Sequence, residues 1–75
     1  MLFLIEYDRS RGKIVTFRGF GGEESRSAEQ ARLEMELDLN RRGVEREVVL
    51  LEAENEEALR RTHRRYFEDL AQLVS

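Results

Sequence analysis

The feature that most constrains this chain is a pair of short apolar segments that flank a turn close to its beginning. Residues 2–7 read LFLIEY and residues 13–18 read KIVTFR, and both are rich in the branched and aromatic residues that favour β-strands. Between them, residues 8–12 read DRSRG, in which Asp suits the first position of a turn and Gly supplies a left-handed residue at its end. We therefore expect a β-hairpin with a four-residue loop in which Asp8 pairs with Lys13.

The predicted hairpin is apolar on both of its faces. With regular pairing, Tyr7 faces Ile14, Ile5 faces Thr16 and Leu4 faces Phe17. Because side chains alternate along a strand, one face then carries Leu2, Leu4, Val15 and Phe17, and the other carries Phe3, Ile5, Tyr7 and Ile14. A sheet face that meets water is usually polar, so both faces of this hairpin need a cover.

The remainder of the chain predicts one further strand and two helices. A capping box over residues 27–30 opens a helix that ends at Gly43, and residues 44–53 (VEREVVLLEA) form the strand. Asn55 caps a last helix that continues to about Val74. The expected fold class is α+β: one domain over residues 1–75, in the order β-β-α-β-α, with a three-stranded sheet, an N-terminal hairpin and two helices packed on it.

Helical periodicity separates buried from exposed positions. The first helix has an apolar stripe of Ala28, Ala31, Met35 and Leu39, whereas Leu33 and Leu37 lie on nearly the opposite side. The predicted core consists of Leu4, Phe17, Met35, Leu39, Leu51, Leu59, Tyr66 and Leu70.

Two arrangements would cover both sheet faces. Either the helices lie on opposite faces, or both lie on one face and another chain covers the second. We favour the second arrangement, since small domains often gain stability from oligomerisation. It predicts a homodimer, and an unknown protein partner is a further possibility. The candidate dimer interface consists of Phe3, Ile5, Tyr7, Ile14, Leu33 and Leu37.

Charge patterning provides one candidate binding surface. The last helix carries four arginines, Arg60, Arg61, Arg64 and Arg65, on its solvent side. They could bind RNA or an acidic partner. Each, however, also has a carboxylate four residues away, in Glu56, Glu57, Glu68 and Asp69. The net charge of −3 also argues against nucleic acid as the general partner, so we expect a solvated face of ion pairs.

The sequence offers little material for catalysis. Cys is absent and His63 is the only histidine, so neither a thiolate nor a His-rich metal site can form. His63 and Tyr66 could act together only with a further acid or nucleophile. Residues 18–22 (RGFGG) match neither glycine-rich phosphate motif. We expect no enzyme activity, no cofactor and no metal.

The first residues do not match a secretory signal, and this bears on the cellular compartment that we expect. Five apolar residues precede Glu6, fewer than a secretory signal needs, and no apolar segment is long enough to span a membrane. We therefore expect a cytoplasmic protein. The function that the sequence favours is that of a small non-catalytic binding domain that self-associates, with RNA or acidic-partner binding through the four arginines as the alternative.

Overall fold

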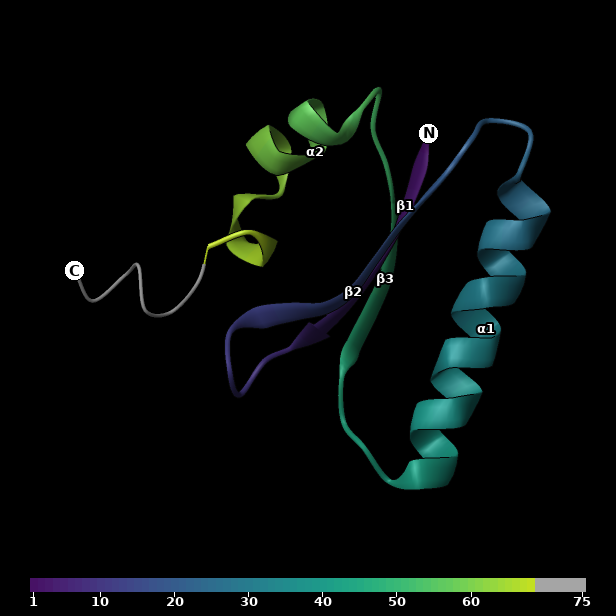
Figure 1. Cartoon of the computed structure of the whole chain (residues 1–75), viewed down its shortest axis with the longest axis vertical. Helices are drawn as coiled ribbons and strands as arrows, with labels where there is room; N and C mark the ends of the chain where they lie inside the picture. The colour runs from purple at the N-terminus through teal and green to yellow at the C-terminus, as the bar shows by residue number, and fades with distance from the viewer. Residues whose placement is uncertain (69–75) are drawn as a thin grey trace.

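The computed structural model describes residues 1–68 and has the element order β-β-α-β-α. The strands are β1 (Leu2–Asp8), β2 (Lys13–Phe20) and β3 (Glu47–Glu52); the helices are α1 (Ser25–Arg42) and α2 (Glu56–Thr62), followed by the short 3₁₀ helix η1 (Arg64–Tyr66). The strands form one antiparallel sheet in the order β2-β1-β3, so β1 is central (Figure 1). The predicted α+β class and element order are confirmed.

The predicted hairpin loop is also confirmed. Asp8 pairs with Lys13, and Gly12 has a φ of 67°, the left-handed conformation that glycine adopts without steric cost. The Asp8 carboxylate holds the loop by accepting hydrogen bonds from the Ser10 hydroxyl (2.7 Å), the Ser10 amide (3.0 Å) and the Arg11 amide (3.2 Å). These hydrogen bonds, the Ser10 hydroxyl above all, lower the pKa of Asp8.

Farther from the loop, the predicted register is wrong by one residue. Tyr7 faces Ile14 as expected, but Glu6 faces Thr16, so Val15 is an extra residue that forms a β-bulge. Ile5 therefore faces Phe17, and Leu4 faces Arg18. A one-residue shift moves every later side chain to the other face. Phe17 accordingly joins the face of Phe3, where the two rings stack at 5.6 Å between centroids.

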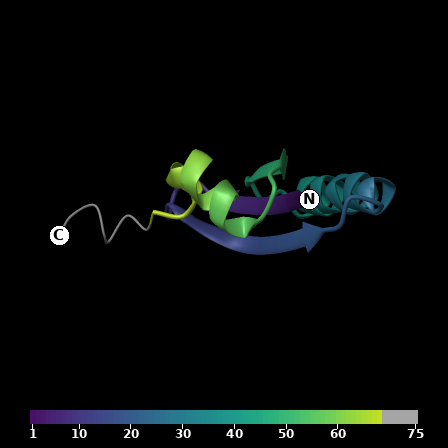
Figure 2. The same ribbon diagram turned by 90° about the horizontal axis from the view of Figure 1, so that it is seen from above.

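The two helices cover opposite faces of the sheet, so the prediction that both lie on one face is wrong. Residues of α1 pack on Leu4 and Phe20, whereas Leu59 of α2 and Tyr66 of η1 pack on Phe3, Ile5 and Tyr7. Figures 1 and 2 show α1 alone on one side of the strands. The physical reason is width: three strands spaced by about 4.8 Å give a sheet about 10 Å across, which is the diameter of one helix.

The start of α1 also differs from the prediction. The helix begins at Ser25, and Glu24 is its N-cap residue without a side-chain cap, so residues 27–30 do not form the capping box. The Glu24 carboxylate instead accepts a hydrogen bond from the Gly21 amide at 2.9 Å, which closes the connector from β2. The predicted end is confirmed: Gly43 has a φ of 65°, and Arg41 and Arg42 occupy the last turn.

The last helix is much shorter than predicted. Asn55 caps it as expected, since its side chain accepts a hydrogen bond from the Ala58 amide at 2.8 Å, but α2 ends at Thr62. The expected end near Val74 lies outside the described residues. The chain then turns through η1, which brings Tyr66 edge-on to Tyr7 at 5.2 Å and Phe67 edge-on to Phe17 at 5.8 Å. Packing of these aromatic rings takes precedence over helical propensity.

Half of the predicted core residues are buried. Leu4, Leu39, Leu59 and Tyr66 are buried, whereas Phe17, Met35 and Leu51 are half-buried and Leu70 lies outside the described residues. The prediction missed the other buried apolar residues, which are Phe3, Ile5, Tyr7, Phe20 and Ala28. Their burial follows from the helices on opposite faces, because β1 is then covered on both sides.

We expect Gly43→Ala to lower the free energy of unfolding by about 1 kcal/mol, because an L-residue resists positive φ. The site isolates this backbone effect, since an added Cβ at Gly43 meets no atom within 4 Å. Gly22→Ala is the matched control: its Cβ also meets nothing, and its φ is not positive. Urea denaturation compares the two; equal stability of both variants would contradict a left-handed Gly43.

We expect Leu59→Ala to lower the free energy of unfolding by about 2–5 kcal/mol, because Leu59 is fully buried at the centre of the α2 layer. Leu37→Ala is the control, since Leu37 is 52% exposed on α1 and surface changes cost about 0.5 kcal/mol or less. Thermal and urea unfolding measure both. A Leu59→Ala protein as stable as the control would place α2 off the sheet.

Candidate interaction surface

The outer edge of β3 is an unpaired row of backbone hydrogen-bonding groups. The Ala53 amide donates to the Met1 carbonyl (3.0 Å), and along an antiparallel strand such bonds alternate, so Glu47, Val49 and Leu51 face β1. The amides and carbonyls of the alternate residues, Val48 and Leu50, therefore point away from the sheet. Among residues 1–68, no strand pairs with this edge.

The side chains along the same edge are apolar and only partly covered. Residues 48–51 read VVLL, and all four are half-buried. A shallow groove runs beside them, between the edge and the Glu29 and Arg32 side chains of α1. Natural proteins usually protect an edge strand with charges, proline or a bulge. In β3 only the terminal Glu47 and Glu52 are charged, so its centre has none of these protections.

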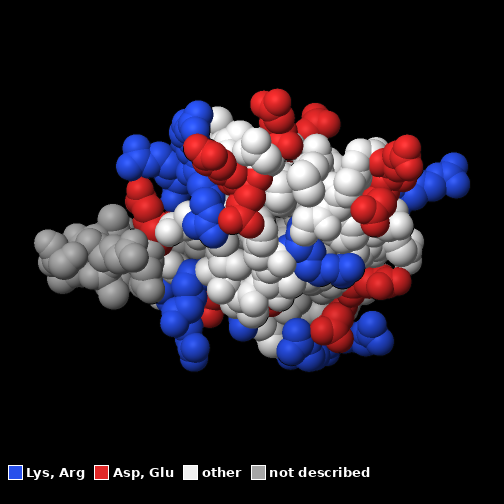
Figure 3. Space-filling view, turned by 45° about the horizontal axis from the view of Figure 1, so that its top comes forward, with Lys and Arg blue, Asp and Glu red and all other residues white. Residues whose placement is uncertain are grey.

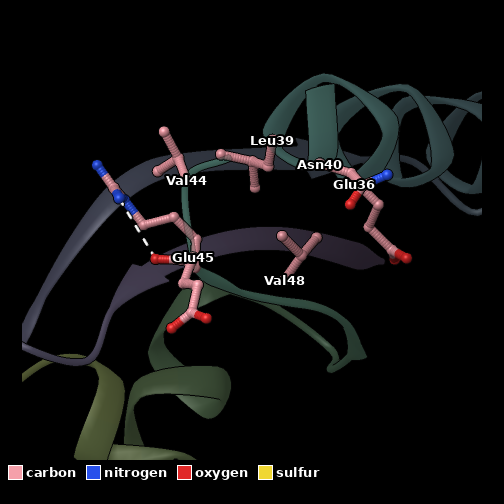
Figure 4. A pocket seen from close by; sticks show the side chains of 7 residues that line it. Glu36, Leu39, Asn40, Val44, Glu45 and Val48 are labelled. Atoms are coloured by element: carbon pink, nitrogen blue, oxygen red, sulfur yellow. Dashed lines mark hydrogen bonds between the residues drawn. The ribbon is translucent and has the colours of Figure 1, made fainter. Parts of the chain in front are cut away.

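A second hollow continues this groove toward the C-terminal end of α1. Figure 4 shows its apolar wall, formed by Leu39, Val44 and Val48, with the polar side chains of Glu36 and Asn40 at its rim. Arg46 and Glu45 line it too, and the Arg46 guanidinium donates to the Glu45 carbonyl at 3.4 Å. An apolar floor with a charged rim suits a peptide or protein partner better than a small molecule, because the hollow is open.

The opposite edge of the sheet, β2, is protected in the usual ways. Val15 forms the bulge and is 49% exposed, and Lys13 and Arg18 place positive charges along the strand. Arg18 also lies over the Phe20 ring at 5.0 Å. The β2 edge is therefore protected against pairing with a further β-strand, whereas the β3 edge is open to one.

A buried carboxylate lies near the end of this surface. Glu6, on the α1 face of β1, is 7% exposed and accepts a hydrogen bond from the Thr16 hydroxyl at 2.8 Å. The Arg46 Nε lies 3.4 Å from its other oxygen, which balances the charge. Arg46 thus places its Nε in an ion pair with Glu6 and donates from another nitrogen to the Glu45 carbonyl, and its side chain lines the hollow beside β3.

A second ion cluster joins η1 to β3 and the hairpin loop. The Glu47 carboxylate accepts hydrogen bonds from the Tyr66 hydroxyl and from Arg65 (2.5 Å), and the Arg9 Nε lies 3.6 Å away. The Tyr66 hydroxyl, followed by Arg65 and Arg9, lowers the pKa of Glu47. Burial of Tyr66, followed by its hydrogen bond to Glu47, raises the pKa of Tyr66. The cluster stabilises the chain reversal after α2.

The four candidate binding arginines are exposed, as predicted, and carboxylates engage them. Arg60 pairs with Glu56 at 3.1 Å, Arg61 with Glu57 at 2.9 Å and Arg64 with Glu68 at 3.7 Å, which confirms three of the predicted ion pairs. The fourth predicted pair involves Asp69, outside the described residues; Arg65 binds Glu47 across the fold instead. On the face that Figure 3 shows, basic and acidic side chains are intermingled.

The structure separates the residues of the candidate dimer face. Phe3, Ile5 and Tyr7 are buried under α2 and η1, and Ile14 packs against the same cluster, so in this fold they are covered within one chain. Leu33 and Leu37 are exposed by 50% and 52% on the far side of α1. They stand apart from the other four, and two leucines alone make a small contact. Whether the chain dimerises stays a prediction.

The remaining sequence candidates form no reactive set. The Tyr66 hydroxyl bonds to Glu47 and Arg65, and the described contacts of His63 involve its backbone rather than its ring. In the part of the chain that the structure describes, no group of three acidic, His or Cys side chains could hold a metal ion. Within residues 1–68, no helix has the length and apolar character needed to cross a membrane.

Comparison with protein families, with curated proteins and with solved structures finds no match to this chain. The open β3 edge was not predicted from the sequence. The apolar segment 48–51 is visible there, but one strand reveals neither the order of the strands nor which of its residues point outward. The charged residues of the β2 segment, Lys13 and Arg18, were the available signal in the sequence, because charges are typical of an edge strand.

We expect Glu47→Gln to lower the free energy of unfolding by about 1–2 kcal/mol at neutral pH, the scale of a hydrogen bond to a charged group. Because the folded pKa of Glu47 lies below its unfolded value, its contribution is complete above about pH 4.3 and is lost as pH falls through the folded pKa. The difference from the parent chain should therefore shrink in acid.

Urea denaturation at a series of pH values measures this effect. Glu54→Gln is the matched control, because Glu54 is exposed and has no hydrogen bond or ion pair to residues 1–68; its stability should stay within about 0.5 kcal/mol of the parent. A Glu47→Gln deficit that is unchanged in acid would mean that the carboxylate charge is not the stabilising feature.

Proposed function

We propose that this protein is a small, non-catalytic interaction domain of the cytoplasm that acts by associating with a second copy of itself. The observation that carries the proposal is the open β3 edge, where outward backbone groups and a half-buried VVLL segment coincide. An extended strand added to such an edge gains main-chain hydrogen bonds and apolar contacts together. A chain without Cys needs no oxidising compartment in order to fold.

The size of the chain supports self-association. A domain of this length buries only about 60% of its unfolded surface, and here that surface is divided between two thin layers on either side of the sheet. Adding three more strands at the β3 edge would cover the half-buried segment and extend both layers. The four arginines support RNA binding less well, because three of them already pair with carboxylates one turn away.

Val48→Lys tests the proposal, because a lysine in the middle of an edge strand blocks pairing with another strand. We expect the parent chain at tens of micromolar to show twice its mass of 8.9 kDa in light scattering, and Val48→Lys to show the monomer mass. Val15→Lys is the control for an added charge at a sheet edge: it introduces the same residue on the β2 edge, at a position that is 49% exposed where Val48 is half-buried, and it should remain dimeric.

Circular dichroism shows whether Val48→Lys is folded, and it should give the parent spectrum. A parent chain that stays at 8.9 kDa throughout the concentration range would overturn the proposal. So would a folded Val48→Lys variant that dimerises as well as the parent.

A further inference from the structure

We infer that two copies of the chain pair their β3 strands antiparallel about a two-fold axis at Val49, which forms a continuous six-stranded sheet closed by two ion pairs between Arg46 of one copy and Glu52 of the other. This inference rests on the proposed self-association and specifies its surface, register and charges.

Backbone geometry restricts the possible registers. The outward groups belong to Val48, Leu50 and Glu52, all even-numbered, since Glu47, Val49 and Leu51 bond to β1. In an antiparallel pair the hydrogen-bonded residues face each other, so even residues must face even residues of the second copy. A register with Glu47 opposite Glu52 would pair an odd residue with an even one, so it cannot form. The two like charges therefore do not face each other when the strand pairs with its own copy.

Two symmetric registers then place the apolar segments together, one centred on Val49 and the other on Leu50. Centring on Val49 puts Val48 opposite Leu50 and puts Glu52 opposite Arg46, twice by symmetry. Centring on Leu50 leaves Glu52 opposite an apolar Val48. Opposite charges on facing residues stabilise a sheet, so the charges favour the register at Val49.

Both charged groups are able to form the new pair. Glu52 is exposed and has no hydrogen bond or ion pair to residues 1–68. The Arg46 Nε lies 3.4 Å from Glu6 and one further N–H donates to the Glu45 carbonyl, so of the five N–H groups of a guanidinium three have no such contact within residues 1–68. Glu47 needs nothing from the second copy, because Tyr66 and Arg65 already bind it.

The groove beside β3 fits the same arrangement. A two-fold axis perpendicular to the sheet puts both α1 helices on one face and both α2 helices on the other. Each groove, bordered by Glu29 and Arg32 of α1 and by residues 48–52, then faces the incoming strand. The contact therefore extends beyond the backbone edge to the side of α1 that carries Glu29 and Arg32.

Single cysteines test the register, because the parent chain has none. Facing residues of a non-hydrogen-bonded pair have Cα atoms about 4.5 Å apart, which suits a disulfide. Under mild oxidation, Val49→Cys should form a covalent dimer about tenfold faster than Leu50→Cys or Leu51→Cys, whose symmetry mates lie farther away. Non-reducing electrophoresis measures the rates.

The charges are tested separately. Glu52→Arg should raise the dimer dissociation constant about tenfold, since both ion pairs become repulsive. Glu54→Arg is the control, because Glu54 would face Val44 of the second copy, and it should leave the constant unchanged within about twofold. Analytical ultracentrifugation measures both.

The outcomes separate this inference from the proposed function. A parent chain that is dimeric by mass, with Val49→Cys crosslinking no faster than Leu50→Cys, would overturn the register at Val49 and leave self-association standing. A dimer equally stable with Glu52→Arg would overturn the ion pairs. A parent chain that is monomeric throughout would remove the proposed function itself.

Discussion

Burial of β1 on all sides is the constraint on which the rest of this structure depends. Six consecutive residues of this strand, from Phe3 to Asp8, are buried, although strands normally expose one face. Its edges are covered by β2 and β3, and its two faces by α1 and by α2 with η1. A sheet this narrow has room for about one helix on each face, so α1 occupies one face and α2 with η1 occupies the other.

Burial of β1 also brings two carboxylates into the interior, and the fold compensates each of them. Glu6 is satisfied by Thr16 and Arg46, and Asp8 by the Ser10 hydroxyl and two loop amides. Both groups belong to the hairpin end of the sheet, where Glu47 adds a third acid with its own partners. Polar residues thus determine where the hairpin loop and η1 lie, while apolar residues determine which layer covers which face.

The two edges of the sheet differ, and the difference bears on function. The bulge at Val15 and the charges of Lys13 and Arg18 protect β2, whereas β3 presents an uncharged centre with free backbone groups. A protein that needed only to stay monomeric would be expected to protect both edges. The asymmetry therefore supports a role for the β3 edge in binding another strand. Because its outward residues are even-numbered, pairing with an identical strand does not set Glu47 against Glu52.

The sequence by itself determined the local structure: the hairpin loop with its left-handed Gly12, the end of α1 at Gly43, the Asn55 cap and the ion pairs along α2. Each depends on residues within four or five positions of one another, so a single segment contains the physical cause. Only the tertiary structure decided the bulge at Val15, the end of α2 at Thr62, the cover on both faces of β1 and the open edge of β3. These depend on contacts between distant segments, such as Tyr66 with Glu47 and Phe17 with Phe67, whose packing outweighs the preferences that each segment shows alone.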